Sequence, residues 1–198
     1  MKQIDEMTVA VTGGIGSGKS VMCRRFERRG IRVYDCDASA KRLMADDESL
    51  KKQLCALVSP ALYDGGKLQK RLLAEFILQS NSHKQAVNDI VHPAVAADFM
   101  SSGYHWMESA ILFESAFDRR VPFDCVVCVV APLELRVQRI MERDGLTRGK
   151  ALEWINRQMP QEEIVKKSNY CLVSGRDDIE QQVDDMLADM QSRYCGKD

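Results

Sequence analysis

The feature that most constrains this 198-residue chain is the glycine-rich segment from Gly13 to Ser20, which reads GGIGSGKS. It matches the phosphate-loop pattern of a glycine, four residues of any type and then Gly-Lys-Ser. The segment follows a short apolar run, Met7 to Val11, and leads into a predicted helix from Gly18 to Arg28. A buried strand, a glycine turn and a helix in this order predict an α/β fold that binds a nucleotide phosphate.

Each residue type in this segment has a physical reason to be there. Glycines allow the backbone to curl around a phosphate with N–H groups pointing inward, and the helix N-terminus adds partial positive charge. Lys19 is predicted to bridge the β- and γ-phosphates, and Ser20 to bind Mg²⁺ through its hydroxyl. The predicted nucleotide contacts here are Gly14, Ile15, Gly16, Ser17, Gly18, Lys19, Ser20 and Val21. A glycine turn without a ligand is the alternative, which the flanking strand and helix make the weaker interpretation.

Strand-like and helix-like segments alternate along most of the chain. Further strands are predicted at about residues 31–34, 105–112, 124–131 and 170–173, and helices at 133–143, 148–159 and 177–194. Four helical segments are predicted between them, at 38–44, 49–58, 68–79 and 83–100. The predicted fold is α/β: a P-loop three-layer α/β/α core with a mostly parallel five-stranded sheet, formed by residues 1–37 and 103–198. Residues 38–102 form a helical insertion in this prediction, and a lid covers about 138–160.

Composition argues against several other classes of protein. The net charge of -1 gives no basic field for nucleic acid or an anionic membrane, and no apolar run approaches the roughly 18 residues that span a bilayer. The N-terminus has no apolar signal segment and the seven cysteines are an odd number, which favours reduced thiols in the cytoplasm. Cys125 and Cys128 have C-x-x-C spacing, but residues three apart on a strand point to opposite faces, so a structural role is predicted.

Carboxylates follow the predicted second and third strands. No Asn/Thr-Lys-x-Asp tetrapeptide for guanine is present, so ATP is the predicted nucleotide. Asp35 and Asp37 stand at the carboxyl edge of the sheet, where one of them is suited to accept a proton from an attacking hydroxyl. The alternative is a helix cap, which suits Asp37 by position. Glu108 and Glu114 stand where a carboxylate commonly reaches Mg²⁺, and a solvated loop glutamate is an equal alternative for Glu114.

Three arginines, Arg136, Arg139 and Arg143, recur at three- and four-residue spacing and so share one face of the helix after the fourth strand. Three guanidinium groups beside a phosphate loop are suited to clamp phosphates and stabilise transition-state charge. The alternative is a solvated face balanced by Glu134 and Glu142. The run into Asp144-Gly145 favours a mobile lid.

From Thr8 to Gly175 the chain resembles the dephospho-coenzyme A kinase family. Five segments carry the resemblance, namely Thr12 to Ser20 (phosphate loop), Asp35 to Asp37 (Asp-Ala-Asp), Asn88 to Pro93 (the His-Pro helix of the acceptor-binding insertion), Ile111 to Glu114 (Leu-Leu-Phe-Glu) and Gln138 to Leu146 (lid). In this chain, His92-Pro93 is predicted to break the helix around it.

This resemblance implies transfer of the ATP γ-phosphate to the ribose 3′-hydroxyl of dephospho-coenzyme A, with Mg²⁺ as cofactor. It implies Asp37 as the base, with Lys19 and Arg143 neutralising developing charge and Arg139 in the nucleotide site. The implied substrate contacts are Thr12, Asp37, His92 and Glu108, and the implied metal ligands are Ser20 and Glu108.

The chain departs from the family pattern at three places. Val21 replaces the usual Thr after the loop serine, Glu108-Ser109-Ala110 stands in place of Asp-x-Pro, and Leu68-Gln69-Lys70 in place of Leu-Asp-Arg. Two other functions remain open at this stage: a kinase for another small acceptor such as a nucleoside monophosphate, and a nucleotide-gated binding module. The sequence does not decide between a monomer and a weak homo-oligomer.

Overall fold

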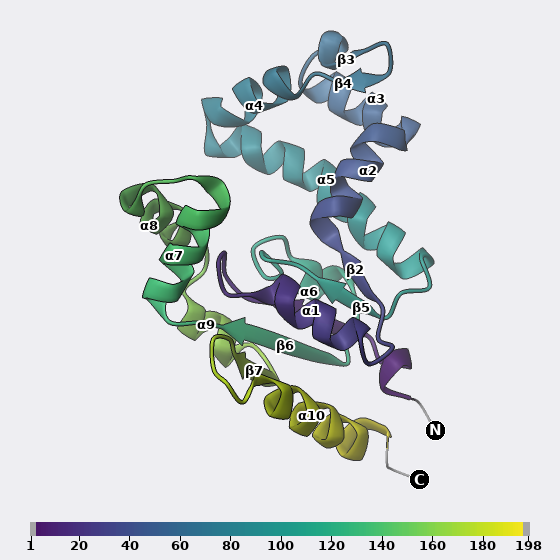
Figure 1. The fold of residues 1–198 in the computed structure, drawn as a ribbon. Helices are drawn as coiled ribbons and strands as arrows, with labels where there is room; N and C mark the ends of the chain where they lie inside the picture. The colour runs from purple at the N-terminus through teal and green to yellow at the C-terminus, as the bar shows by residue number, and fades with distance from the viewer. Residues whose placement is uncertain (1–2, 196–198) are drawn as a thin grey trace. The chain divides into compact units, whose positions relative to one another are not determined.

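The computed structural model describes residues 3–195, and the chain divides into two compact units (Figure 1). One unit comprises the chain up to Tyr34 and from Tyr104 onward, and the other comprises Asp35–Gly103. Among the helices that the structure describes, none combines the length and apolar character needed to cross a bilayer.

The first unit is built on a five-stranded sheet. Its strands are β1 (Val9–Thr12), β2 (Val33–Asp35), β5 (Trp106–Glu108), β6 (Cys125–Val130) and β7 (Tyr170–Val173), in the order β2-β5-β1-β6-β7. β1 pairs in parallel with β5 and with β6, and β6 pairs in parallel with β7. All four residues of β1 are buried, as expected for the central strand of a sheet covered on both faces. The predicted fold class is confirmed.

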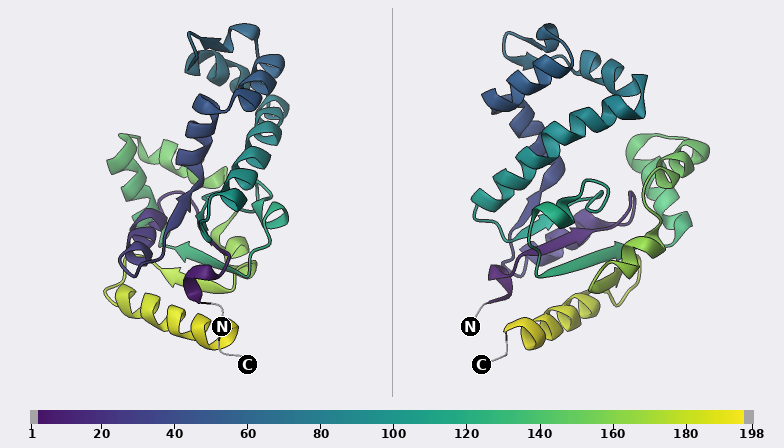
Figure 2. Two further views of the ribbon diagram at one scale, coloured as in Figure 1. Left: turned by 90° about the vertical axis from the view of Figure 1, so that its right-hand side faces the viewer. Right: turned by 180° about the vertical axis from the view of Figure 1, so that it is seen from behind.

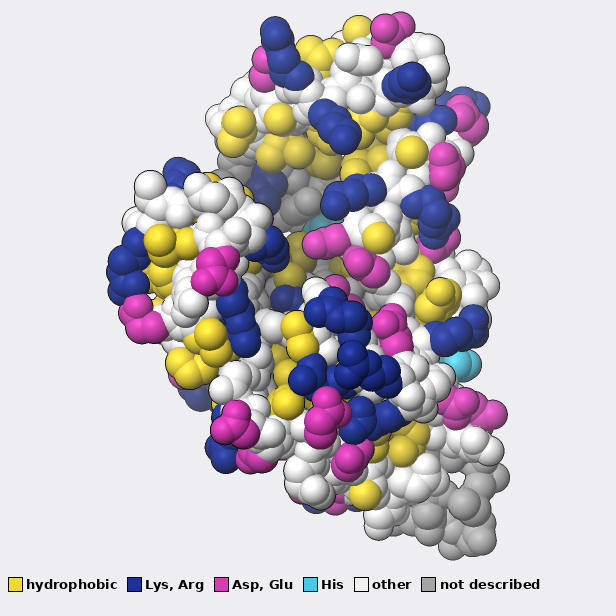
Figure 3. Space-filling view, in the orientation of Figure 1, with side chains coloured by type: hydrophobic (Ala, Val, Ile, Leu, Met, Phe, Trp, Pro, Cys, Tyr) yellow, Lys and Arg dark blue, Asp and Glu magenta, His cyan; other side chains and the backbone are white. Residues whose placement is uncertain are grey.

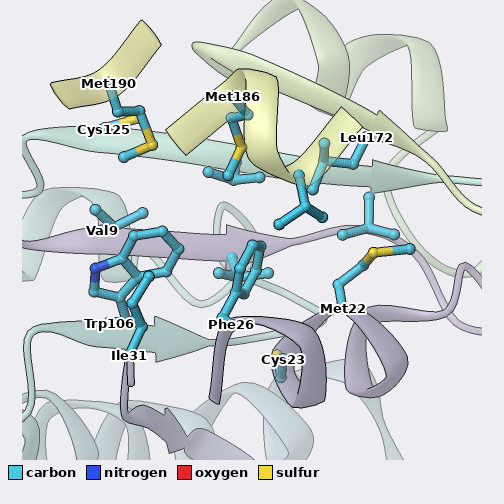
Figure 4. Close-up of a cluster of buried hydrophobic side chains, with 14 of the residues drawn as sticks. Val9, Met22, Cys23, Phe26, Ile31, Trp106, Cys125, Leu172, Met186 and Met190 are labelled. Carbon is cyan, nitrogen blue, oxygen red and sulfur yellow. The ribbon is translucent and has the colours of Figure 1, made fainter. Parts of the chain in front are cut away.

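Helices cover both faces of this sheet. On one face, α1 (Lys19–Glu27) and α10 (Ile179–Met190) pack their apolar stripes against the strands, and Figure 4 shows Met22, Phe26 and Met186 meeting there. The rings of Phe26 and Trp106 lie with centroids 5.0 Å apart. On the other face, α9 (Gln161–Lys166) places Ile164 against Cys128 and Val130. The sheet is therefore the middle layer of three.

The cysteine pair behaves as predicted. Cys125 belongs to the cluster that contains α1 and α10, and Cys128 to the cluster with α9. Burial raises the pKa of the Cys125 thiol to about 12. The two sulfur atoms lie on opposite faces of the sheet and cannot bind one metal ion.

The segment between β6 and α9 contains most of the residues predicted to form a lid, and that role stays a prediction. It consists of α7 (Leu133–Asp144) and α8 (Arg148–Asn156), which share a small core of Val137, Ile140, Ala151 and Ile155. Gly145 ends α7 in the left-handed conformation, with φ 65°, and Thr147 caps α8 through its side chain. A short helix, α6 (Phe117–Arg120), stands between β5 and β6.

The second unit is mainly helical (Figure 2). Its helices are α2 (Cys36–Asp46), α3 (Glu48–Leu57), α4 (Lys70–Gln79) and α5 (Asn81–Ser101), and a two-stranded hairpin joins β3 (Tyr63–Asp64) to β4 (Lys67–Leu68). α5 packs against the other three helices, and α4 has no fully buried residue. The apolar side of α4 is therefore only partly covered.

Two predictions about elements were wrong. Pro93 lies inside α5 and does not end it, although proline lacks the N–H group that would bond to the preceding turn. Burial of Val91 and Val95 on either side stabilises the helix across this lost hydrogen bond. The strand predicted at 105–112 ends at Glu108. The chain turns there, with the Ser109 hydroxyl accepting the N–H of Ile111, and Leu112 is buried in the turn.

Candidate nucleotide-binding site

The glycine-rich segment joins the carboxyl end of β1 directly to the first turn of α1. Gly18 is the N-cap of α1, and Lys19 and Ser20 are its first residues. Because β1 is the central strand, the loop stands in the middle of the carboxyl edge of the sheet. This is the position at which open α/β sheets bind their ligands.

Lys19 and Glu108, both predicted site residues, lie beside each other. The Lys19 Nζ atom is 3.3 Å from the carbonyl oxygen of Gly14 and 3.8 Å from Glu108 Oε1. Glu108 is placed there by the pairing of β5 with β1, which sets it opposite Val11. The Glu108 side chain is 15% exposed, so this charge pair stands in a largely sheltered position.

A pocket of about 450 Å³ opens between the loop and α7. Six of the predicted nucleotide contacts line it, together with the predicted catalytic residue Arg143, and the six are Gly16, Gly18, Lys19, Ser20, Val21 and Arg139. A lysine, two arginines and a helix N-terminus in one pocket favour a polyanionic ligand such as a triphosphate.

The three arginines of α7 do not act as one group. Arg139 Nη1 donates to the carbonyl oxygens of Gly16 and Ser17, each at 3.2 Å, and to Ser174 Oγ at 2.9 Å. The Arg143 guanidinium is exposed and pairs with Asp144 at 2.7 Å, which raises its pKa.

Arg136 is turned away from this role. It is buried, burial lowers its pKa, and its Nε donates to the Ile15 carbonyl oxygen at 3.0 Å. The predicted common face of three phosphate-binding arginines is therefore wrong for Arg136, because the loop backbone occupies it. The alternative of a solvated face balanced by Glu134 and Glu142 is also wrong for Arg136, which is buried, while Glu134 pairs with Arg148 and Glu142 accepts from Gln138.

Sequence reasoning missed two residues that contact the loop. Gln158 Oε1 accepts the N–H of Ile15 at 2.6 Å, and Ser174 Oγ meets Arg139 next to Gly18. No sequence signal pointed to them, since these contacts join segments far apart in the chain. Glu114, by contrast, accepts the N–H of Met159 at 2.9 Å, so it holds the segment that connects α8 to α9.

The acidic residues after β2 have separate positions on α2. Asp35 is the helix cap: its Oδ1 accepts the N–H of Ala38 at 2.9 Å. Asp37 lies exposed in the first turn, so the prediction that position suits Asp37 to the cap was wrong, and its side chain is not committed to that bond. His92 is half-buried in α5. Asp37 and His92 belong to the second unit and Thr12 is buried at the end of β1, and the roles given to all three remain predictions.

The residues at the pocket suit a magnesium ion that arrives with a nucleotide. Within residues 3–195, no cluster of three or more His, Cys, Asp or Glu side chains is arranged to hold a metal ion by itself. Mg²⁺ in nucleotide sites typically takes one or two protein oxygens, with phosphate and water oxygens completing the octahedron. The exposed Ser20 hydroxyl in the pocket and the nearby Glu108 carboxylate are donors of the right kind.

A sheet of this strand order, with a phosphate loop on its central strand and Arg139 and Arg143 of α7 lining the pocket beside that loop, defines a P-loop kinase. A family model described as dephospho-CoA kinase matches residues 7–178. A dephospho-CoA kinase from Bacteroides fragilis is 40% identical over 173 residues, spanning 84% of this chain and 83% of its own length. The chain belongs to the dephospho-CoA kinase family.

Solved structures agree on the fold. A Thermus thermophilus protein at 32% identity superposes with a TM-score of 0.77, over 93% of this chain and 97% of its own. A Campylobacter jejuni dephospho-CoA kinase at 21% identity superposes with a TM-score of 0.66, over 92% of this chain and 96% of its own, and shows the shared fold.

Proposed function

We propose that this chain phosphorylates the ribose 3′-hydroxyl of dephospho-coenzyme A with the γ-phosphate of ATP, the last step of coenzyme A synthesis. The observation that carries the proposal is the pocket that unites the phosphate loop with Lys19, Arg139 and Arg143 in a chain of this family. The proposal includes the cytoplasmic location that suits an ATP-dependent biosynthetic enzyme. Family membership favours this acceptor over a nucleoside monophosphate or a switched protein partner.

The loop backbone is proposed to hold the phosphates. Ile15 and Ser17 already donate their N–H groups, to Gln158 and to the Gly14 carbonyl oxygen at 3.1 Å. We therefore narrow the phosphate-binding amides to those of Gly14, Gly16 and the residues from Gly18 to Ser20. Lys19 and Arg143 neutralise charge that develops on the transferred group, the largest contribution in phosphoryl transfer.

Ser20 and Glu108 would hold Mg²⁺, which when bound supplies positive charge to the β- and γ-phosphate oxygens. The ion pair between Lys19 and Glu108 keeps the lysine at the pocket before nucleotide binds. Closure of the lid would exclude water and so limit hydrolysis of ATP.

The helical unit is proposed to bind the acceptor. It contains a pocket of about 760 Å³ with an apolar floor that includes Met44, Leu68 and Leu73. Three lysines line the same pocket, and these are Lys41, Lys67 and Lys70. Figure 3 shows hydrophobic side chains exposed between α2 and α4, with Lys and Arg side chains beside them. Dephospho-coenzyme A has a diphosphate and a long pantetheine arm, which match the lysines and the apolar floor respectively.

Asp37 is proposed to align the 3′-hydroxyl and accept its proton. We expect Asp37→Asn to lower kcat by about 10² to 10⁴, the usual contribution of general base catalysis. The matched control is Asp35→Asn two residues away, because asparagine also caps helices and should leave turnover near wild type. Turnover of Asp37→Asn within about tenfold of wild type would remove Asp37 from the role of base.

The direct test of the reaction is incubation with Mg-ATP and dephospho-coenzyme A, with the products identified by mass. The expected products are coenzyme A and ADP in equal amounts. A panel with adenosine monophosphate and shikimate as acceptors measures selectivity, and faster turnover of either would contradict the proposal.

A further inference from the structure

One residue of the phosphate loop, Ile15, is held through its N–H and its carbonyl oxygen by residues at the two ends of the predicted lid. The Ile15 carbonyl oxygen accepts from Arg136 Nε at 3.0 Å, and the Ile15 N–H donates to Gln158 Oε1 at 2.6 Å. The Ile15 side chain also packs against the lid core beside Val137 and Ile140. Arg136 lies in the first turn of α7 and Gln158 lies two residues beyond α8, so the two ends of the lid meet at Ile15.

The loop glycines on either side of Ile15 make this approach possible. A Cβ atom on Gly14 would lie 2.3 Å from Arg136 Nη2 and 3.4 Å from Gln158 Oε1. A Cβ atom on Gly16 would lie 2.7 Å from the Arg136 carbonyl oxygen. Real Cβ atoms do not approach backbone oxygens so closely, and φ at Gly16 is +76°. The backbone of α7 therefore fits against the loop only because Gly16 lacks a side chain, whereas a side chain at Gly14 would displace the Arg136 guanidinium.

Arg136 and Gln158 do not belong to the nucleotide pocket. Among the described residues that line it, the lid contributes Arg139, Ile140, Glu142 and Arg143. The bonds to Ile15 fix the orientation of both of its peptide groups, because rotating either one breaks a hydrogen bond at a partly buried position. An unmade hydrogen bond of this kind costs more than the bond itself contributes.

We propose that Gln158 is a positioning residue which, together with Arg136, holds the phosphate loop in its anion-binding form and couples the loop to the lid. The inference rests on the proposed kinase function and adds a residue to it. The base of the lid and the loop move as one body, and lid motion is confined to the outer, exposed turn around Gly145. Gln158 affects catalysis through Ile15 and does not touch the nucleotide.

The test compares Gln158→Met with Gln182→Met. Methionine keeps the length of the side chain and removes the acceptor. Gln182 is a matched control, since its Oε1 accepts the backbone N–H of Val173 at 2.9 Å in another part of the same unit. For Gln158→Met we expect KM for ATP to rise up to about tenfold, the size of one hydrogen bond to a partly buried group, and acceptor-independent ATP hydrolysis to rise relative to transfer.

For Gln182→Met we expect a lower Tm and unchanged kinetic constants. Gln158→Glu retains an oxygen that accepts the Ile15 N–H beside Arg136, and should bring KM for ATP back toward wild type. Equal kinetic constants for Gln158→Met and Gln182→Met would overturn the inference, while wild-type transfer to dephospho-coenzyme A would still support the proposed function.

Amide exchange in the wild-type protein provides a measurement that does not depend on any variant folding. In nucleotide-free protein we expect the Ile15 amide to exchange more slowly than an exposed loop amide, because it donates to Gln158 Oε1 at a partly buried position. An Ile15 amide that exchanges at the rate of an exposed loop would also overturn the inference.

Discussion

Val21 is the residue of the nucleotide pocket at which a small change should improve the enzyme. It lies in the first turn of α1, is 37% exposed and lines the pocket beside Ser20. Val21→Thr keeps the shape of the side chain and replaces a methyl group by a hydroxyl, at a position suited to contact the α-phosphate. A hydrogen bond to a charged group contributes about 1.5 kcal/mol, so KM for ATP should fall by up to about tenfold. Steady-state kinetics of Val21→Ala distinguish the effect of the added hydroxyl from the effect of losing the valine side chain. An equal fall in KM for ATP in both variants would exclude the hydroxyl as the cause.

The charge of Glu108 should determine the Mg²⁺ concentration that the enzyme needs. Glu108→Gln keeps the size of the side chain but removes the carboxylate 3.8 Å from Lys19. We expect the Mg²⁺ concentration for half-maximal rate to rise about tenfold, since Mg²⁺ prefers charged oxygen donors. Glu114→Gln is the control, because glutamine can still accept the Met159 N–H and the magnesium titration should not move. Superimposable titrations for Glu108→Gln and wild type would exclude Glu108 from the metal site.

At this scale, the sequence predicted residues whose chemistry depends on local spacing. Lys19 and Ser20 are fixed by the loop pattern, and Arg139 and Arg143 follow from the helical repeat. Gln158 could not be predicted, because its partner Ile15 is 143 positions away and glutamine carries no special signal. Arg136 was misassigned for the same reason: its helical spacing is visible in the sequence, but the loop that covers it is not.

The paired strands β6 and β7 give one cysteine an unusual acidity. Cys128 and Cys171 stand opposite each other in the parallel register, and the hydrogen bond between their thiols lowers the pKa of the exposed Cys171 to about 7. The same contact raises the pKa of the buried Cys128, which remains protonated and acts as the donor.

Cys171 should therefore be protonated and slow to alkylate below pH 7, and reactive above it, because the thiolate is the nucleophile. We expect iodoacetamide labelling of the Cys171 peptide, followed by mass spectrometry, to show a midpoint near pH 7. Cys128→Ala removes the donor and should move the midpoint up toward about 8.5, the ordinary value. A midpoint that stays in place would show that Cys128 is not the cause.

Among the elements, long periodic helices and fully apolar strands were the predictable ones. β6 and α7 begin within a residue of the predicted positions because apolar runs and turns bound them. Helix α4 was placed two residues too early, since Leu68 pairs with Tyr63 in a hairpin that the sequence did not reveal. The strand predicted through residue 112 was too long, because the apolar residue Leu112 is buried in a turn and not in a strand. In each case a tertiary contact overrode the local pattern.

At the scale of the whole molecule, the two compact units suggest that ATP and acceptor are recognised separately. Substitutions of the residues that line the pocket of the helical unit should then change KM for the acceptor and leave KM for ATP unaltered. The lysines of the helical pocket allow this to be tested. The pantetheine arm of the acceptor is neutral, so the diphosphate is the strong charge that these lysines would bind.

We expect Lys41→Ala, Lys67→Ala and Lys70→Ala each to raise KM for dephospho-coenzyme A a few-fold, since a partly exposed charge pair contributes about 0.2 to 1 kcal/mol. The triple variant should also lose most of the salt dependence of this KM, because screening acts on the charges it lacks. Lys52→Ala is the matched control, an exposed lysine on α3 of the same unit that does not line the pocket. If the three variants instead raised KM for ATP, or matched Lys52→Ala, the helical unit would not bind the acceptor through this pocket, and its partly covered α4 would need another explanation.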